Sequence, residues 1–182
     1  IFTPDDIMAD RLPKGRVLIF DDDNYYMGPV IAERLSAAGC NVSFVTPESK
    51  VGAWGGYTAE QMRSQKRLIE LEVDIQTGKI LQAFKDGTAT VANVYTGLKE
   101  QIAADNLVLV TARQPNDGLY REVSDRLDKV AGASPLSVKR IGDCEAPAII
   151  AAAVYSGHRY ARELDSSLDE NVPQDRLFDV SG

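Results

Sequence analysis

The sequence predicts an α/β fold of the Rossmann-like, FAD/NAD(P)-binding type: a three-layer domain that carries a β-meander insert. Two observations lead to this prediction. Apolar strand-like segments alternate with helical segments over residues 16–71, which is typical of a parallel sheet covered by helices. Several short strand-like segments then follow one another without a helix, and an Asp-Gly pair at residues 86–87 separates two of them, which indicates an antiparallel hairpin.

Each element follows from its local pattern. Strands are expected where β-prone apolar residues cluster or alternate, at residues 16–21, 41–45, 73–76, 79–85, 88–95, 106–110 and 138–141. Helices are expected at residues 29–38, 59–71, 119–130 and 147–164. Gly39 is placed as a C-terminal cap, and the second helix should bury Met62, Leu68 and Leu71.

The amino-acid composition limits the classes of function that the chain can have. The 182 residues are 44% hydrophobic and 26% charged, as in ordinary globular proteins. A net charge of −7 argues against a nucleic-acid partner, and no apolar run reaches the roughly 20 residues that span a membrane. The two cysteines, Cys40 and Cys144, form no CxxC pair, so we expect reduced thiols in a cytoplasmic protein.

The chain divides into four predicted segments. Residues 1–15 resemble a linker, and residues 16–112 form the first α/β domain. Residues 113–164 contain further elements, and residues 165–182 are a polar, acidic and loosely ordered tail. The start at Ile1 rather than methionine is typical of a piece cut from a longer polypeptide.

The loop Phe-Asp-Asp-Asp-Asn-Tyr-Tyr-Met-Gly at residues 20–28 lies where a dinucleotide-binding chain carries its glycine-rich phosphate loop. Only Gly28 is a glycine, and Asp21, Asp22 and Asp23 would repel phosphate. We therefore expect no NAD(P) at this loop. We interpret the aspartates as helix caps or as part of an interface.

Two later segments carry more specific patterns. Residues 107–116 read Leu-Val-Leu-Val-Thr-Ala-Arg-Gln-Pro-Asn, a strand followed by Arg, any residue, Pro and Asn. Residues 138–144 end in Gly142-Asp143-Cys144 ahead of a helix. A carboxylate at that position can bind sugar or ribityl hydroxyls, and the following helix offers N–H groups to phosphates. Helix capping is the alternative role for Asp143.

In this order the two segments resemble the glutathione-reductase-like region of the trimethylamine dehydrogenase family, which includes dimethylamine and histamine dehydrogenases. The segment from Ile141 to Leu164 is similar to that family's "IGDAEAP…GHR.ARE" signature, and Val45-Thr46-Pro47 is similar to its "VTP" strand end. The resemblance covers roughly residues 3–164.

The resemblance implies a C-terminal fragment of an FMN and [4Fe–4S] oxidoreductase that oxidises a small N-methylated amine. Residues 113–164 would be the returning strand and helix of a second nucleotide-binding domain, which holds ADP or FAD. Gly142 and Asp143 match the Gly-Asp pair beside the ribityl chain, while Ala112 and Arg113 stand at the reductases' Gly-Arg pair, with alanine replacing glycine.

The implied partners are the TIM barrel of the same parent chain and an electron-transfer flavoprotein, and self-association into a homo-oligomer stays open. We expect the fragment alone to be inactive, to hold no cofactor firmly and to contain no catalytic residue or metal ligand. Two alternatives remain. One is an NAD(P)H-dependent flavin reductase of the 2,4-dienoyl-CoA reductase type, and the other is a non-catalytic interdomain or oligomerisation module.

Overall fold

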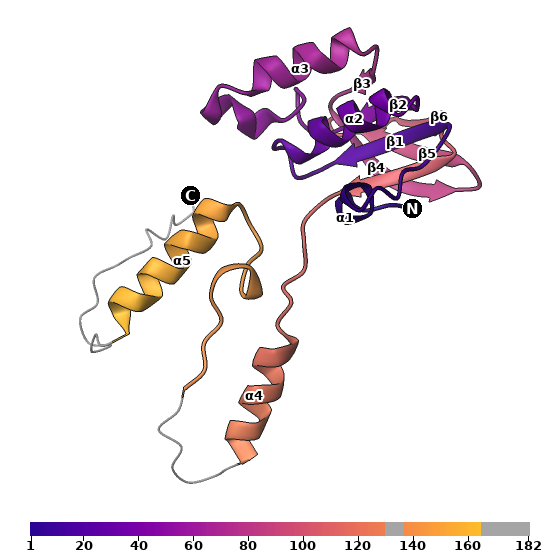
Figure 1. The fold of residues 1–182 in the computed structure, drawn as a ribbon. Coiled ribbons are helices and arrows are strands. Elements are labelled where there is room, and N and C mark those ends of the chain that lie inside the picture. The colour runs from indigo at the N-terminus through magenta and orange to yellow at the C-terminus, as the bar shows by residue number, and fades with distance from the viewer. Residues whose placement is uncertain (130–136, 165–182) are drawn as a thin grey trace. The chain divides into compact units, whose positions relative to one another are not determined.

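A computed structural model describes residues 1–129 and 137–164 of the chain (Figure 1). The chain divides into two compact units, Ile1–Ala112 and Arg113–Gly182, and each is described by itself. The sequence prediction of an α/β protein is confirmed, because parallel and antiparallel sheets occur together with helices. The expected acidic tail, residues 165–182, lies outside the described residues.

The first unit is built on a parallel sheet of four strands in the order β3-β2-β1-β7. The strands are β1 (Arg16–Asp21), β2 (Asn41–Val45), β3 (Asp74–Gln76) and β7 (Asn106–Val110). Strand β1 is central: it pairs with β2 on one side and with β7 on the other. Its residues Val17–Phe20 are all buried, as expected of a strand that is covered on both faces.

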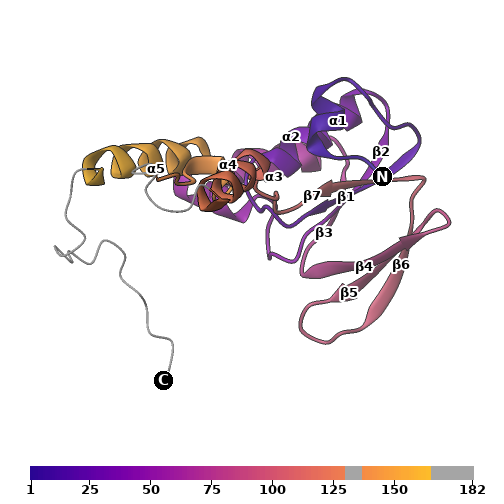
Figure 2. The same ribbon diagram turned by 90° about the horizontal axis from the view of Figure 1, so that it is seen from below.

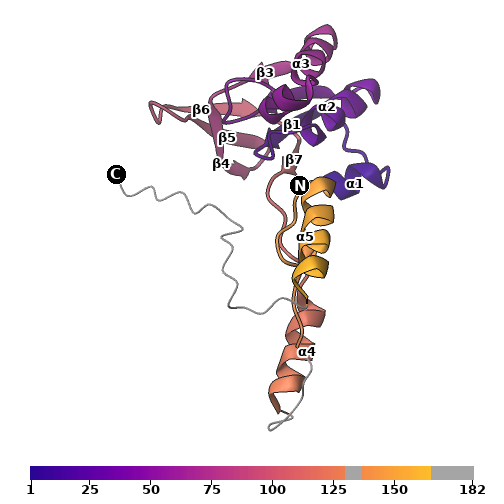
Figure 3. The same ribbon diagram turned by 90° about the vertical axis from the view of Figure 1, so that its left-hand side faces the viewer.

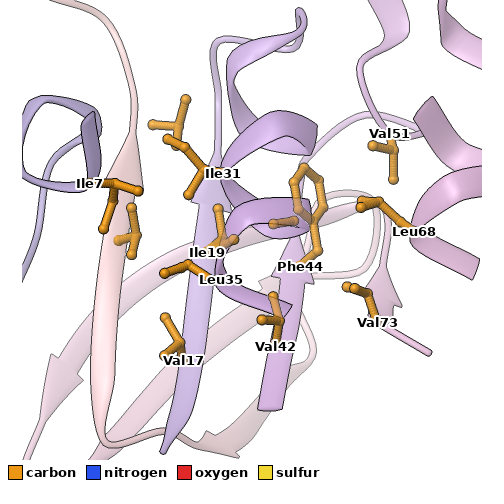
Figure 4. Packing of buried hydrophobic residues seen from close by; sticks show 13 residues of the cluster. Ile7, Val17, Ile19, Ile31, Leu35, Val42, Phe44, Val51, Leu68 and Val73 are labelled. Carbon is orange, nitrogen blue, oxygen red and sulfur yellow. The ribbon is translucent and has the colours of Figure 1, made fainter. Parts of the chain in front are cut away.

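Helices cover one face of this sheet. Because side chains alternate along a strand, Val17 and Ile19 of β1 point to the face that carries α1 (Pro4–Met8), α2 (Met27–Ala37) and α3 (Gln61–Glu70). Figure 4 shows Ile31 and Leu35 of α2 beside these strand residues. Phe44 and Leu68 complete this core, and both are almost fully buried.

An antiparallel meander covers the opposite face. It consists of β4 (Lys79–Lys85), β5 (Thr88–Asn93) and β6 (Lys99–Ala103), in that order. Leu18 and Phe20 of β1 pack in the same buried cluster as Ala89 and Val91 of β5. The first unit therefore has three layers, with the parallel sheet between the helices and the meander (Figures 2 and 3).

The predicted hairpin at residues 86–87 is confirmed. Asp86 and Gly87 have φ angles of 49° and 73°, as a two-residue turn of type I′ requires. The meander differs from the prediction at both ends. Strand Asp74–Gln76 joins the parallel sheet beside β2, and β5 ends at Asn93 because its side chain accepts the backbone N–H groups of Tyr95 and Thr96. The polar strand β6 was not predicted.

The expected linker at residues 1–15 is instead part of the folded unit. Phe2 bridges to Val108 of β7, and helix α1 follows with a capping box between Thr3 and Asp6. Ile7 is only 2% exposed because it packs in the helical core. A segment of 15 residues with few apolar side chains resembles a linker, but Phe2, Ile7 and Leu12 attach it to the first unit.

Helix α3 corrects one predicted core residue. Leu68 is 1% exposed and Leu71 packs against the core, but Met62 is 81% exposed. The buried face of α3 also contains Gln61, seven residues before Leu68 and two helical turns away. Met62 is rotated about 100° from that face, so it points to solvent.

In the second unit, the structure describes α4 (Gly118–Lys129), a 3₁₀ turn η2 (Gly142–Cys144) and α5 (Ile150–Glu163). None of the described residues of these three elements is buried. The predicted strand at residues 138–141 is absent from the described part of the unit, because a strand needs a paired neighbour for its backbone. The last helix begins at Ile150 rather than at Pro147.

Candidate functional site

The acidic loop, residues 22–26, leaves the carboxyl end of β1 and leads into α2. The chain crosses from β1 to β2 on one side, while β7 lies on the other side of β1. In open α/β sheets the crevice at such a reversal of strand order is the usual place for a ligand. The loop therefore occupies the position where this fold class binds nucleotides.

Asp21, the last residue of β1, has its side chain fully buried beneath the loop. One carboxyl oxygen, Oδ1, accepts the backbone N–H of Asn24 at 3.1 Å. The other oxygen, Oδ2, is buried and has no hydrogen-bond partner. It lies against Gly28, because a Cβ added there would be 2.6 Å from this oxygen.

Burial is the main reason why the pKa of Asp21 rises from 3.8 to about 7. The negative charges of Asp23 and Asp22 raise the pKa further, whereas the N–H groups of Asn24 and Asp23 lower it. Near neutral pH this carboxyl group therefore exchanges between its neutral and its charged form. The two neighbouring aspartates are exposed to solvent.

Asn24 connects the loop to two other segments. Its backbone has a left-handed φ of 59°, which asparagine tolerates better than most residues. Its side-chain oxygen accepts the hydroxyl of Thr46 at 3.1 Å, and its side-chain amide donates to the backbone oxygen of Asp22. Its backbone oxygen accepts the N–H of Trp54 at 2.9 Å. These bonds hold the loop closed against β2 and the segment that follows it.

The closed loop differs from a dinucleotide-binding phosphate loop in three of its backbone donors and in its charge. A phosphate loop binds pyrophosphate through free backbone N–H groups at the start of a helix. Here the N–H groups of Asp22 and Asp23 donate to the Val110 oxygen at 2.8 and 3.2 Å, and that of Asn24 donates to Asp21. These three N–H groups are used within the protein, and the side chains of Asp22 and Asp23 beside them are exposed and negative.

The interpretation of the aspartates as helix caps is wrong. Helix α2 has Tyr26 at its N-cap position, and no side chain caps it there. Asp21 instead turns back toward Asn24 and Gly28. The alternative interpretation, that the aspartates line an interface, stays a prediction.

Two pairs of aromatic side chains lie in the acidic loop and in the 3₁₀ helix η1 (Ala53–Thr58) that is bonded to it. Tyr25 and Tyr26 contact each other edge to face, with ring centroids 5.0 Å apart. Trp54 and Tyr57, in η1, have centroids 5.7 Å apart. Tyr26, Trp54 and Tyr57 are 48%, 56% and 85% exposed, so they form an aromatic surface rather than a core.

Sequence reasoning missed the roles of Asn24 and Thr46. The parallel register of β1 and β2 aligns Phe20 with Val45, which brings the residues that follow them, Asp21 and Thr46, to the same edge of the sheet. No local pattern predicts a hydrogen bond across the 22 residues that separate Asn24 from Thr46. The signal available in the sequence was the position of Thr46 directly after the apolar strand of residues 41–45.

The predicted cofactor-binding pair Gly142 and Asp143 lies together in the 3₁₀ turn η2 of the second unit. Gly142 has a φ of 59°, and its N–H donates to the hydroxyl of Ser156 on α5 at 2.9 Å. Asp143 is exposed, and its Oδ1 accepts the N–H of Ala148 at 3.3 Å. Asp143 Oδ1 thus stabilises the turn before α5 but does not cap the helix, because Ile149 is the N-cap residue and no side chain caps it there. The other oxygen, Oδ2, makes none of the bonds found in the described residues.

The other predicted pair, Ala112 and Arg113, follows β7. Ala112 is the last residue of the first unit and Arg113 the first of the second, and both are exposed. Their assignment as cofactor-binding residues stays a prediction. Within residues 1–129 and 137–164, no group of three or more His, Cys, Asp or Glu side chains could hold a metal ion. No described helix is long and apolar enough to cross a membrane.

Residues 2–111 match the family model of the OYE-like second alpha/beta domain, which is more than half of the chain. The chain belongs to this family. The match includes the acidic loop and the N-terminal anchor residue Phe2, and it ends directly before Ala112.

Relatives of this OYE-like domain include oxidoreductases that act on amines. The chain is 30% identical to dimethylamine dehydrogenase of Hyphomicrobium sp. (strain x), over 92% of the chain and 25% of the relative. It is 29% identical to N,N-dimethylglycine/sarcosine dehydrogenase of Chromohalobacter salexigens, over 87% of the chain and 26% of the relative. The chain thus spans about a quarter of the length of the curated relatives that it matches.

Solved structures agree with this relationship. Histamine dehydrogenase from Rhizobium sp. 4-9 superposes with a TM-score of 0.86 and 38% identity, over 100% of this chain and 29% of that one. The 6-hydroxypseudooxynicotine amine oxidase from Pseudomonas geniculata N1 gives a TM-score of 0.78 and 35% identity, over 87% and 23% of the two chains. The recognition of the amine dehydrogenase group from sequence motifs is confirmed.

Proposed function

We propose that this chain is the C-terminal part of an FMN and [4Fe–4S] oxidoreductase of the trimethylamine dehydrogenase type, which oxidises a small N-methylated amine. In this proposal the first unit is a Rossmann-like domain that has lost nicotinamide binding. The reducing equivalents leave the parent enzyme through an electron-transfer flavoprotein instead, in the cytoplasm.

The occupied N–H groups of the acidic loop carry the proposal. Three consecutive donors, those of Asp22, Asp23 and Asn24, are bonded to Val110 and Asp21, so a pyrophosphate could bind them only after these bonds break. A reductase that takes hydride from NADPH needs these donors free. An enzyme that passes electrons from an amine to a protein acceptor does not need free N–H donors in this loop.

The flavin and the cluster belong, in this proposal, to the part of the parent that these 182 residues do not include. Four thiolates hold a [4Fe–4S] cluster, and the chain has two cysteines. FMN would supply the acceptor for the two electrons of amine oxidation. The second unit, with Gly142 and Asp143, would contribute to an ADP or FAD site, because the outer carboxylate oxygen of Asp143 is available to a sugar hydroxyl.

Calorimetric titration of the chain with NADPH and NADH tests the lost nicotinamide site. We expect no binding up to millimolar concentration. Micromolar affinity for NADPH would contradict the proposal and favour an NAD(P)H-dependent flavin reductase. A parallel titration with ADP and FAD tests the second unit, and Asp143→Asn should weaken any binding found there.

The amine substrate is tested on the protein from the whole gene. We expect secondary or tertiary methylamines to reduce an artificial one-electron acceptor without added NAD(P)⁺. A strict requirement for NADPH would refute the proposed reaction. Absence of turnover with every amine, together with an intact flavin spectrum, would favour a non-catalytic or different role for this region.

A further inference from the structure

Asp21 is a buried acid that the proposed function does not use. Its side chain is inaccessible to solvent, and Oδ2 is an unpartnered polar atom inside the protein. A neutral carboxyl group tolerates such a place, whereas an ionised one loses most of its hydration there. The position is therefore stable only while the group keeps its proton.

In the described part of the chain, no positive side chain is among the groups that affect the ionisation of Asp21. Within residues 1–129 and 137–164, none of the ion pairs formed includes Asp21. On its own loop it faces Asp22 and Asp23, which repel a second negative charge. From the packed elements it meets Gly28 of α2 and, through Asn24, Thr46 after β2, and neither ionises. Glu48 joins this network only through its backbone N–H, which donates to the Thr46 hydroxyl.

The same carboxyl group also organises the loop above it. Oδ1 holds the backbone of Asn24, and Asn24 in turn holds Trp54 and Thr46. If Asp21 moves toward water, the Asn24 backbone loses its partner and the link to Trp54 loosens. The arrangement of the exposed side chains Tyr26, Trp54 and Tyr57 would change when this link loosens.

We propose that Asp21 is a proton-dependent latch: in its neutral form it closes the acidic loop onto the sheet, and loss of the proton releases the loop together with Trp54. The device is independent of the proposed function, because it needs neither a flavin nor an amine. Its consequence is that the arrangement of the aromatic surface depends on pH in the neutral range. The raised pKa of Asp21, about 7, places the transition there.

Trp54 is the only tryptophan of the chain, so its fluorescence reports directly on this region. We expect the emission of the full 182-residue chain to change in one sigmoidal step centred near pH 7. Asp21→Asn should abolish the step, since asparagine keeps the oxygen that accepts from Asn24 but cannot ionise. The matched control Asp22→Asn removes an exposed aspartate and should retain the step.

Histidine is the residue type whose charge most often changes near neutral pH, so substitution of the only histidine, His158→Gln, is a second control, which should leave the step unchanged. A pH-independent emission in the wild type, or a step that persists in Asp21→Asn, would overturn the latch. If Asp21→Asn fails to fold, hydrogen exchange of the wild type decides. Protection of the Asn24 amide should fall above pH 7 relative to that of Phe44 in β2, and equal behaviour of the two amides would also refute the proposal.

Discussion

Gly28 lies directly against the carboxyl group of Asp21. A Cβ at position 28 would be 2.6 Å from the Cγ of Asp21 and 3.1 Å from its Cβ, which is closer than van der Waals contact allows. The first turn of α2 can approach β1 this closely only because residue 28 has no side chain. The packing of this helix and the burial of Asp21 are therefore coupled.

The first prediction concerns this contact. Gly28→Ala should lower the free energy of unfolding by about 1–3 kcal/mol, because the added methyl group overpacks a fully buried site. Urea unfolding measures the change. In an Asp21→Ala background the same substitution should cost less, since the clashing carboxyl is gone. Gly56→Ala is the matched control: nothing lies within 4 Å of its Cβ, and a large effect there would contradict the steric explanation.

The second prediction is a pH dependence of stability. The pKa of Asp21 is about 7 in the folded chain against an ordinary 3.8, so the folded state retains a proton that the unfolded state releases. Stability should fall as pH rises from about 4 to 7, by at most about 1.4 kcal/mol per pH unit, and this contribution stays lost above pH 7. Asp21→Asn should remove this slope, which urea unfolding at several pH values would reveal. A slope that is equal in both proteins would show that other groups cause it.

The third prediction compares two residues on α3. Leu68→Ala should destabilise the chain by about 2–5 kcal/mol, because it empties a buried position in the helical core. Met62→Ala, on the exposed side of the same helix, should change stability by less than about 0.5 kcal/mol. Thermal unfolding of both variants measures the contrast. Similar losses at the two positions would mean that α3 packs with a different face.

The fourth prediction concerns the ion pair that joins β1 to the segment before β7. Asp105 accepts from the backbone N–H and the guanidinium of Arg16, and these bonds lower its pKa to about 2. Its stabilising contribution is therefore present above pH 3.8 and is lost as pH falls toward 2. Asp105→Asn should lower Tm at pH 7, and the difference should shrink at pH near 2 and in high salt.

Asp86→Asn is the control for this pair. The Oδ2 atom of Asp86 lies 3.9 Å from the Nζ atom of Lys85, and both side chains are 87% exposed. The charge of Asp86 should therefore contribute little to Tm. An equal effect of Asp86→Asn and Asp105→Asn would indicate a general effect of net charge rather than the specific bonds to Arg16.

Local patterns predicted the elements whose conformation depends mainly on residues that are adjacent in sequence. The strand–helix–strand unit of residues 16–45, the Asp86-Gly87 turn and the apolar strand β7 were all found from the sequence. Strand β6 was missed because its residues Lys-Glu-Gln-Ile-Ala carry little apolar signal, and it exists through pairing with β5. The strand predicted at 138–141 has the apolar signal but no partner in the described residues.

The sequence predicted where the candidate site lies, but it did not predict the contacts that form it. Its position, after one strand and before one helix, follows from residues 16–38. Its closure depends on Asn24, Thr46 and Val110, which are far apart along the chain and meet only through the register of three parallel strands. The family was recognised mainly from motifs in residues 107–164, and the loop at residues 20–28 followed by Val45-Thr46-Pro47 added to that resemblance.

The pairing of β1 with β7 has a kinetic consequence. Arg16 and Asp105, which close one end of this pair, are 89 residues apart, and the first residues of the chain attach to β7 as well. During synthesis one edge of the apolar strand β1 therefore stays unpaired until almost the whole first unit has been made. Parallel pairings of such long separation form slowly, and until β7 arrives the strand Val17–Phe20 is an open template for other chains. Coexpression with a chaperone, or a lower temperature, should increase the soluble yield of this chain more than that of a hairpin-rich domain of equal size.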